Sequence, residues 1–231
     1  MTIDVGADPL GKHAVFVTGG TGYVGRALIR TLIDRGRTVR ALVRAGSETR
    51  LPTGAFAIVG DALDASGFAT SIAPATTLVH LVGTPHPSPS KAREFRDVDL
   101  ASIRASVTAS VTGGVRHIVY VSVAQPAPVM RDYIAARQEG EALVRNSKIP
   151  ATILRPWYVL GPGHRWPCLL LPVYALLERL PATRDGARRL GLVTLEQMVA
   201  ALTDAIARVP AATRIIEVPE IRTARALAHT S

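Results

Sequence analysis

The feature that most constrains this chain is a glycine-rich turn between an apolar run and an amphipathic segment. Gly19, Gly22 and Gly25 lie within VFVTGGTGYVG at positions 15–25. This pattern is typical of a strand, a turn and a helix whose N-terminus binds a pyrophosphate. The first glycine allows a tight turn, the second lets the backbone approach the phosphates, and the third lets the helix pack closely on the strand. The sequence therefore predicts a dinucleotide site, with a ligand-free glycine turn as the alternative.

The segments around this turn support the prediction. Residues 13–18 are apolar and β-branched, as in a buried parallel strand, and apolar residues recur at helical spacing from 24 to 32. Strands and helices then alternate along the chain, which predicts a parallel sheet with helices on both faces. We expect strands at 13–18, 38–43, 55–59, 77–82, 117–123, 151–154 and 214–218, and helices at 24–35, 66–72, 94–112, 133–146, 169–180 and 195–207, the last capped by Thr194.

Composition excludes several classes of protein. The chain has 231 residues, of which 48% are hydrophobic, and it contains one cysteine. A disulfide framework and a cysteine metal site are therefore excluded, and no cluster of residues at ligand spacing predicts a metal. No apolar run approaches the length of a membrane span, and residues 1–10 do not resemble a secretory signal, so we expect a cytoplasmic protein. The net charge of +9 comes from dispersed arginines, which favours an anionic small molecule over a nucleic acid.

The residues after the second strand indicate which nucleotide is bound. NAD-binding proteins often carry an acidic residue about twenty positions past the glycine motif, whereas this strand ends at Arg44. A guanidinium there can hold a 2′-phosphate, which favours NADP(H) over NAD(H). The alternative is an ordinary solvated arginine. Asp61, after the third strand, is placed either to accept a hydrogen bond from the adenine amino group or to cap a turn.

These motifs resemble the short-chain dehydrogenase/reductase superfamily, in particular its atypical, NAD(P)H-binding or NmrA-like branch. The resemblance rests on TGGTGYVG at 18–25, GD at 60–61, VYVS at 119–122, YIAARQEGE at 133–141, TILRP at 152–156 and GPG at 161–163. It implies a Rossmann-type doubly wound parallel sheet with a small C-terminal substrate subdomain. We expect residues 1–155 to form the cofactor-binding domain and residues 156–231 to form a small portion packed with it. The cofactor contacts that the resemblance implies are Thr18, Gly19, Gly22, Tyr23, Val24, Gly25, Arg44, Asp61, Leu81, Val82, Gly83 and Pro156.

The family also implies a Ser-Tyr-Lys catalytic arrangement, from which this chain departs twice. Tyr133 matches the tyrosine, but the position one helical turn later is Arg137, which supplies positive charge and cannot relay a proton. The usual serine or threonine position is Val123, and the neighbouring Ser122 would point to the other side of the strand unless the strand has ended. Tyr133 is thus expected as proton donor, Arg137 as electrostatic and ribose partner, and Ser122 as a candidate orienting residue.

The segment after the sixth strand is the candidate substrate site. Trp157, Tyr158, His164 and Trp166 follow Pro156 at the edge of the sheet where ligands bind. They are placed to wall an apolar site, while the alternative is that Trp157 and Tyr158 fill core. Two functions therefore stay open: an NADP(H)-dependent reductase of a small carbonyl compound, or a non-catalytic NADP(H)-binding sensor. An epimerase or dehydratase is a weaker possibility, and the oligomeric state is expected to be monomer or homodimer.

Overall fold

The chain folds around a parallel seven-stranded sheet. The computed structural model describes residues 14–85, 87–161 and 184–224. The strand order is β3-β2-β1-β4-β5-β6-β9, and every pairing is parallel. The strands are β1 (Ala14–Thr18), β2 (Thr38–Val43), β3 (Phe56–Val59), β4 (Thr77–His80), β5 (His117–Val121), β6 (Ala151–Arg155) and β9 (Thr213–Glu217). This is the doubly wound architecture that the alternation of strands and helices predicts.

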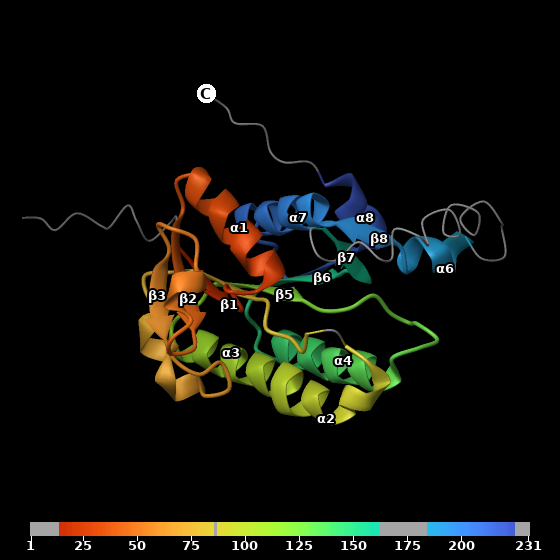
Figure 1. Ribbon diagram of the computed structural model, residues 1–231, viewed down its shortest axis with the longest axis horizontal. Coiled ribbons are helices and arrows are strands. Elements are labelled where there is room, and N and C mark those ends of the chain that lie inside the picture. Colours follow the sequence, from red (N-terminus) through yellow and green to blue (C-terminus); the bar gives the residue numbers. More distant parts are fainter. Residues whose placement is uncertain (1–13, 86, 162–183, 225–231) are drawn as a thin grey trace, which may run out of the picture.

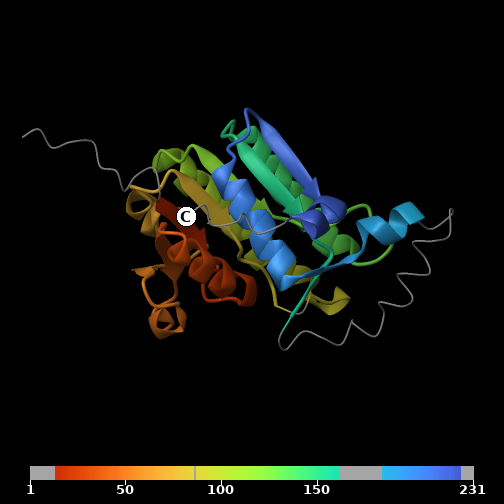
Figure 2. The same cartoon turned by 90° about the horizontal axis from the view of Figure 1, so that it is seen from above.

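Helices cover both faces of the sheet (Figure 1). One face carries α1 (Tyr23–Asp34), α7 (Leu195–Ala207) and α8 (Val218–Thr223), and the other carries α2 (Ala92–Glu94), α3 (Ala101–Thr112) and α4 (Arg131–Asn146). Seen from above, α1 and α7 lie side by side (Figure 2). A π-helical segment, Phe95–Leu100, connects α2 to α3, and α6 spans Arg184–Arg189. Single 3-10 turns lie at Glu48–Arg50, Ala65–Gly67, Ala69–Ser71 and Pro89–Lys91.

The order of the strands places the functional edge. The chain runs outward from β1 to β3 and then returns to β4 on the other side of β1. Between β1 and β4 the direction of winding reverses, and ligands of such sheets bind beyond the carboxyl ends of the strands at that point. Thr18 and His80 end these two strands. The residues that follow Thr18 and His80 therefore lie at the expected ligand-binding edge.

Two short parallel strands extend the fold beside the sheet. They are β7 (Tyr158–Leu160) and β8 (Leu192–Thr194), which pair in register from Tyr158 to Leu160. Helix α7 starts directly after β8. Thr194 caps it by accepting from Gln197 N at 3.1 Å, and the Gln197 side chain accepts from Thr194 N at 2.9 Å. This reciprocal capping box confirms Thr194 as the predicted cap.

Most sequence-predicted elements are confirmed within one or two residues, and three predictions need correction. Residues 66–72 form two 3-10 turns around Phe68 and not one helix. The predicted helix 94–112 contains the π-helical segment, and β7, β8 and α8 were not predicted. The predicted apolar helix at 169–180 lies outside the described residues. Within the described residues, no helix combines the length and apolarity that crossing a membrane requires.

Candidate functional site

The glycine turn closes tightly against two neighbouring elements. Gly19 has a φ of 77°, and a Cβ there would lie 2.7 Å from the carbonyl carbon of Leu81. A Cβ on Gly25 would collide with the carbonyl oxygen of Gly19. Gly22 is the N-cap of α1, and its N–H donates to Gly19 O at 3.1 Å. The turn thus brings the N-terminus of α1 close to the end of β4, as a pyrophosphate site requires.

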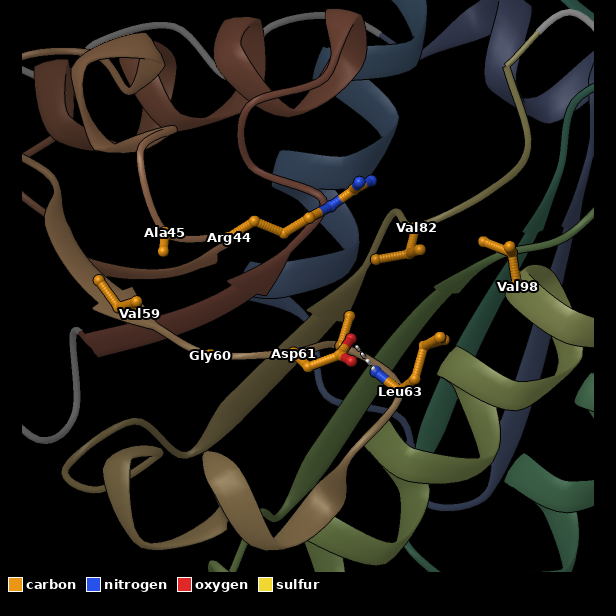
Figure 3. A pocket seen from close by; sticks show the side chains of 9 residues that line it. Arg44, Ala45, Val59, Gly60, Asp61, Leu63, Val82 and Val98 are labelled. Carbon is orange, nitrogen blue, oxygen red and sulfur yellow. Dashed lines mark hydrogen bonds between the residues drawn. The ribbon is translucent and has the colours of Figure 1, made fainter.

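Two cavities open beside this turn. One, of about 350 Å³, is lined by the glycine turn, the ends of β2 and β4, and the residues Arg44, Ser47 and Arg50. The other, of about 490 Å³, is lined by Arg44, Ala45, Val59, Gly60, Asp61, Ala62, Leu63, Val82 and Val98 (Figure 3). Both include Arg44, Gly60, Ala62 and Val82. Adjacent cavities of this kind suit an elongated ligand that carries phosphate and an apolar ring.

Two arginines and a serine face the first cavity. Arg44 follows β2 and is exposed, Ser47 N donates to Arg44 O at 3.0 Å, and Arg50 ends the following 3-10 turn. Arg50 and Ser47 were missed by the sequence reasoning, which stopped at Arg44. Their spacing of three and six residues from Arg44 is the signal that could have identified them, because a compact turn brings such residues to one side.

Asp61 lies in the second cavity with one of its oxygens already engaged. Its Oδ1 accepts from Leu63 N at 2.9 Å, which forms the turn that follows β3 (Figure 3). The sequence left adenine recognition and turn capping as alternatives for this carboxylate. The capping interaction is present, and Asp61 also lines the cavity together with Val82 and Val98.

Thr18, the last residue of β1, has its side chain in the core. Its side chain is buried, and its Oγ1 lies 2.9 Å from Nδ1 of His80 in the core. The same nitrogen lies 3.0 Å from Ser106 Oγ. Burial, together with the positive charge of Arg137, lowers the pKa of His80 to about 3, so the ring stays neutral. The hydroxyl of Thr18 therefore joins β1 to β4 and α3, and the expected contact of Thr18 with the cofactor stays a prediction.

Tyr133 lies in the first turn of α4, half-buried, and is held by aromatic and cationic neighbours. Its ring centroid is 5.0 Å from that of Phe95, with the planes tilted by 57°. The Cζ atom of Arg137 lies 5.2 Å from the Tyr133 ring centroid, within the range of a cation–π interaction. The predicted pair thus lies together, with Phe95 as a third member that the sequence did not reveal.

The guanidinium of Arg137 is buried in an ion pair. Its Nη2 donates to Asp99 Oδ1 at 2.6 Å, and its Nη1 donates to the carbonyl oxygen of Val121 at 3.0 Å. Asp99 is 1% exposed, and its other oxygen accepts from the backbone and hydroxyl of Thr84 at 2.9 and 2.5 Å. Both terminal nitrogens of Arg137 are therefore used within the protein. Its Nε has no hydrogen-bond partner among the described residues, its positive charge lies near Tyr133, and its expected role as ribose partner stays a prediction.

Ser122 is directed to another buried carboxylate. Its Oγ donates to Glu141 Oε1 at 2.7 Å, and Arg155 donates to both oxygens of Glu141 at 2.8 and 2.6 Å. Burial alone would raise the pKa of Glu141, but the hydrogen bonds from Arg155 and Ser122 hold it below its usual value. An ionised acceptor keeps the serine hydroxyl occupied. The orienting role of Ser122 stays a prediction, and Val123, which follows it, is buried.

The residues after β6 lie against the start of α1. Pro156 is buried, Trp157 packs partly buried against the core, and Tyr158 begins β7. Gly161 lies so close to the hydroxyl of Tyr23 that a Cβ there would overlap it. Trp157 thus contributes to core packing, the alternative left open above, whereas His164 and Trp166 lie outside the described residues.

The part of the chain that the structure describes contains no cluster of three or more histidine, cysteine or acidic side chains arranged to hold a metal ion.

Known proteins share both sequence and fold with this chain. Ceramide reductase of Caulobacter vibrioides (strain NA1000 / CB15N) is 29% identical over 221 residues, which are 91% of this chain and 66% of that protein. The 3-beta-hydroxysteroid dehydrogenase of Mycolicibacterium neoaurum is 30% identical over 114 residues, 47% of this chain and 31% of that protein. This chain thus spans less than two thirds of either relative.

A solved short-chain dehydrogenase/reductase superfamily protein from Agrobacterium tumefaciens, with bound NAD, has the same fold. Its TM-score is 0.65 at 21% identity, over 89% of this chain and 77% of that one. The family model described as NAD(P)H-binding matches residues 19–163, which include the glycine turn, both cavities and Tyr133. Because that region is more than half of the chain, the protein belongs to the NAD(P)H-binding family.

Proposed function

We propose that this protein is an NADP(H)-dependent reductase of the atypical, NmrA-like short-chain type, and that it reduces an apolar carbonyl compound. The observation that carries the proposal is the glycine turn opening into cavities that Arg44, Ser47 and Arg50 line on one side. A helix N-terminus with close-packed glycines suits a pyrophosphate, and two guanidinium groups suit a further phosphate. Tyr133 supplies a proton donor on α4.

The cofactor would be held by groups that the cavities already present. The N-terminus of α1 would receive the pyrophosphate, and Arg44 and Arg50 would receive the 2′-phosphate. Val82 and Val98 would pack on the adenine, and Asp61 would accept from its amino group. When bound there, a reduced nicotinamide would be the source of the hydride that a carbonyl carbon accepts.

The chain's own residues handle the proton. As the carbonyl carbon accepts the hydride, the electron pair of its C=O bond moves to oxygen, which takes the phenol proton of Tyr133. The half-buried phenolate that remains recovers a proton from solvent. Arg137, fixed in its ion pair, contributes positive charge beside the tyrosine ring at 5.2 Å and exchanges no proton.

An apolar substrate is favoured by the neighbours of Tyr133. Phe95 packs on its ring, and the position that carries a serine or threonine in the family is here the buried Val123. The two relatives described above are named for a ceramide and a steroid, which are both largely apolar molecules. Methyl ketones of increasing chain length are therefore suitable probes.

The first test is turnover with Tyr133→Phe. NADPH consumption with long methyl ketones should fall by a factor of about 100 or more, the usual contribution of a general acid. NADPH affinity should stay unchanged, because the substitution removes only a hydroxyl. Measurement of initial rates and of NADPH fluorescence titrations decides both points. Unchanged turnover in the variant would exclude Tyr133 as the donor.

The second test addresses the nucleotide. Arg44→Ala and Arg50→Ala should each weaken NADPH binding by about tenfold or more, since a hydrogen bond to a charged group contributes about 1.5–3 kcal/mol. NADH binding should change little. The matched control is Arg116→Ala, because Arg116 is exposed and immediately precedes β5, at the amino ends of the parallel strands and not at the carboxyl ends where the cavities open. Equal losses of affinity for NADH and NADPH would show that Arg44 and Arg50 do not recognise the 2′-phosphate.

A non-catalytic NADP(H)-binding sensor is the second candidate function. It is favoured by the two departures from the family's catalytic set, because Arg137 is ion-paired to Asp99 and the Ser122 hydroxyl donates a hydrogen bond to Glu141. Tight NADPH binding without consumption of NADPH across the ketone series would support it over the reductase.

A further inference from the structure

The buried carboxylate of Asp99 links three parts of the candidate site. It lies on the π-helical segment Phe95–Leu100, and its two oxygens serve different partners. Oδ1 accepts from Arg137 on α4, while Oδ2 accepts from both the N–H and the hydroxyl of Thr84, which follows β4. One side chain thus joins the helix that carries Tyr133 to the segment after β4, which lines the cavity of about 350 Å³.

The same segment contacts the site at two further points. Phe95, four residues before Asp99, packs on the ring of Tyr133, and Val98 lines the cavity of about 490 Å³. A π-helical turn holds more residues per turn than an α-helix and is frequent at functional sites. Here Phe95 and Asp99 are both 1% exposed. The segment therefore directs an aromatic ring and a carboxylate to the same buried side.

The cofactor side of this contact is equally close. A Cβ on Gly83 would collide with Nη2 of Arg137 and would lie 3.2 Å from Asp99 Oδ1. The backbone of the segment after β4 thus rests directly on the ion pair. Leu81, Val82, Gly83 and Pro85 of that segment line the cavity of about 350 Å³. A displacement of the ion pair would consequently be felt by the cavity wall and by Tyr133 together.

We propose that Asp99 is a positioning residue of the candidate active site, which fixes Arg137 beneath Tyr133 and the Gly83–Thr84 backbone at the cofactor cavity. The inference rests on the proposed role of Tyr133 as proton donor. Loss of a buried pair that only stabilised the fold would lower stability without displacing both Tyr133 and the Gly83–Thr84 backbone. Asp99 itself does not touch the substrate in this proposal, and it acts through Arg137 and Thr84.

The test uses the full-length protein labelled with fluorotyrosine. The fluorine NMR resonance of Tyr133 is identified by its absence in Tyr133→Phe. In Asp99→Asn, this resonance should move or broaden, and NADPH affinity measured by fluorescence should fall by about tenfold. Neither measurement depends on a carbonyl substrate, so failure of the reductase proposal is seen separately, as absent turnover in the wild-type protein.

Two further variants separate positioning from general destabilisation. Glu141→Gln removes a second buried carboxylate, 1% exposed and paired with Arg155, and serves as the matched control. It should lower the melting temperature while leaving the Tyr133 resonance and NADPH affinity at wild-type values. Thr84→Val keeps the ion pair and removes only one hydrogen bond to Asp99, so it folds even where Asp99→Asn does not. It should weaken NADPH binding in the same direction by a smaller factor.

Two results would overturn the proposal. One is a Tyr133 resonance and an NADPH affinity that stay at wild-type values in both Asp99→Asn and Thr84→Val. The other is a Glu141→Gln variant that moves both quantities as much as Asp99→Asn does. The exposed Asp97→Asn, two residues from Asp99 on the same segment, controls for the loss of one negative charge.

Discussion

Two glycines with similar backbone conformations have different surroundings. Gly19 has a φ of 77° and Gly36 a φ of 71°, but only Gly19 has neighbouring atoms where a Cβ would be placed. Gly36→Ala should therefore lower the free energy of unfolding by about 1–2 kcal/mol, the strain of the left-handed region. Gly19→Ala should cost about 1–3 kcal/mol more, since its Cβ meets the Leu81 carbonyl. Only the second variant should also lose NADPH affinity.

Urea unfolding and NADPH titration of both variants check this comparison. Equal losses of stability would mean that the approach of the turn to β4 contributes nothing beyond backbone strain.

At the scale of single residues, the sequence could predict the part of the site that depends on local chemistry. The spacing of the glycines predicted the turn, and Arg44, which was singled out because it follows the second strand, lines the cavity beside that turn. Asp99 could not be found in this way. Asp97 and Asp99 are both acidic residues within a predicted helix, yet Asp97 is exposed and Asp99 is 1% exposed. Only the tertiary contact with Arg137 distinguishes them.

At the scale of elements, the strands were predictable because each is apolar, β-branched and bounded by turn residues. The helix predicted at 94–112 shows where such reasoning ends. Its helical character is real, but the π-helical segment changes which residues face inward, and that change depends on the partners on α4 and after β4. The strands β7 and β8 have three residues each, too few for a periodic pattern. Their pairing is a property of the assembled fold.

At the scale of the whole molecule, two histidines of the described residues, His80 and His117, are buried and neutral and should contribute to its response to acid. Burial lowers the pKa of His117 to about 4 and, with Arg137, that of His80 to about 3. An unfolded histidine titrates near 6.5. Below that pH the unfolded chain binds protons that the folded chain does not, so stability is full above pH 6.5 and falls as pH decreases toward these values.

The expected loss is up to about 1.4 kcal/mol per pH unit for each histidine in this window. Urea unfolding at neutral pH and at mildly acidic pH measures it. His117→Gln should reduce the dependence by the share of one histidine, since the longer amide can still bond the Thr152 hydroxyl that His117 Nε2 meets at 3.0 Å. An unchanged slope in that variant would show that His117 is not one of the groups responsible.

The ladder between β7 and β8 has a consequence for how such a protein can diversify. The chain leaves β7 at Leu160 and returns at Leu192, where β8 pairs with β7. Strand β8 then leads directly into the capped start of α7, so both ends of the connection are fixed. A connection whose two ends are fixed costs little more when it lengthens, about 0.6 kcal/mol for each doubling. Insertions between residues 160 and 192 should therefore be tolerated without unfolding the seven-stranded sheet. Pairing of β7 with β8 would thus allow related proteins to carry connections of different length at this place while the rest of the fold stays the same.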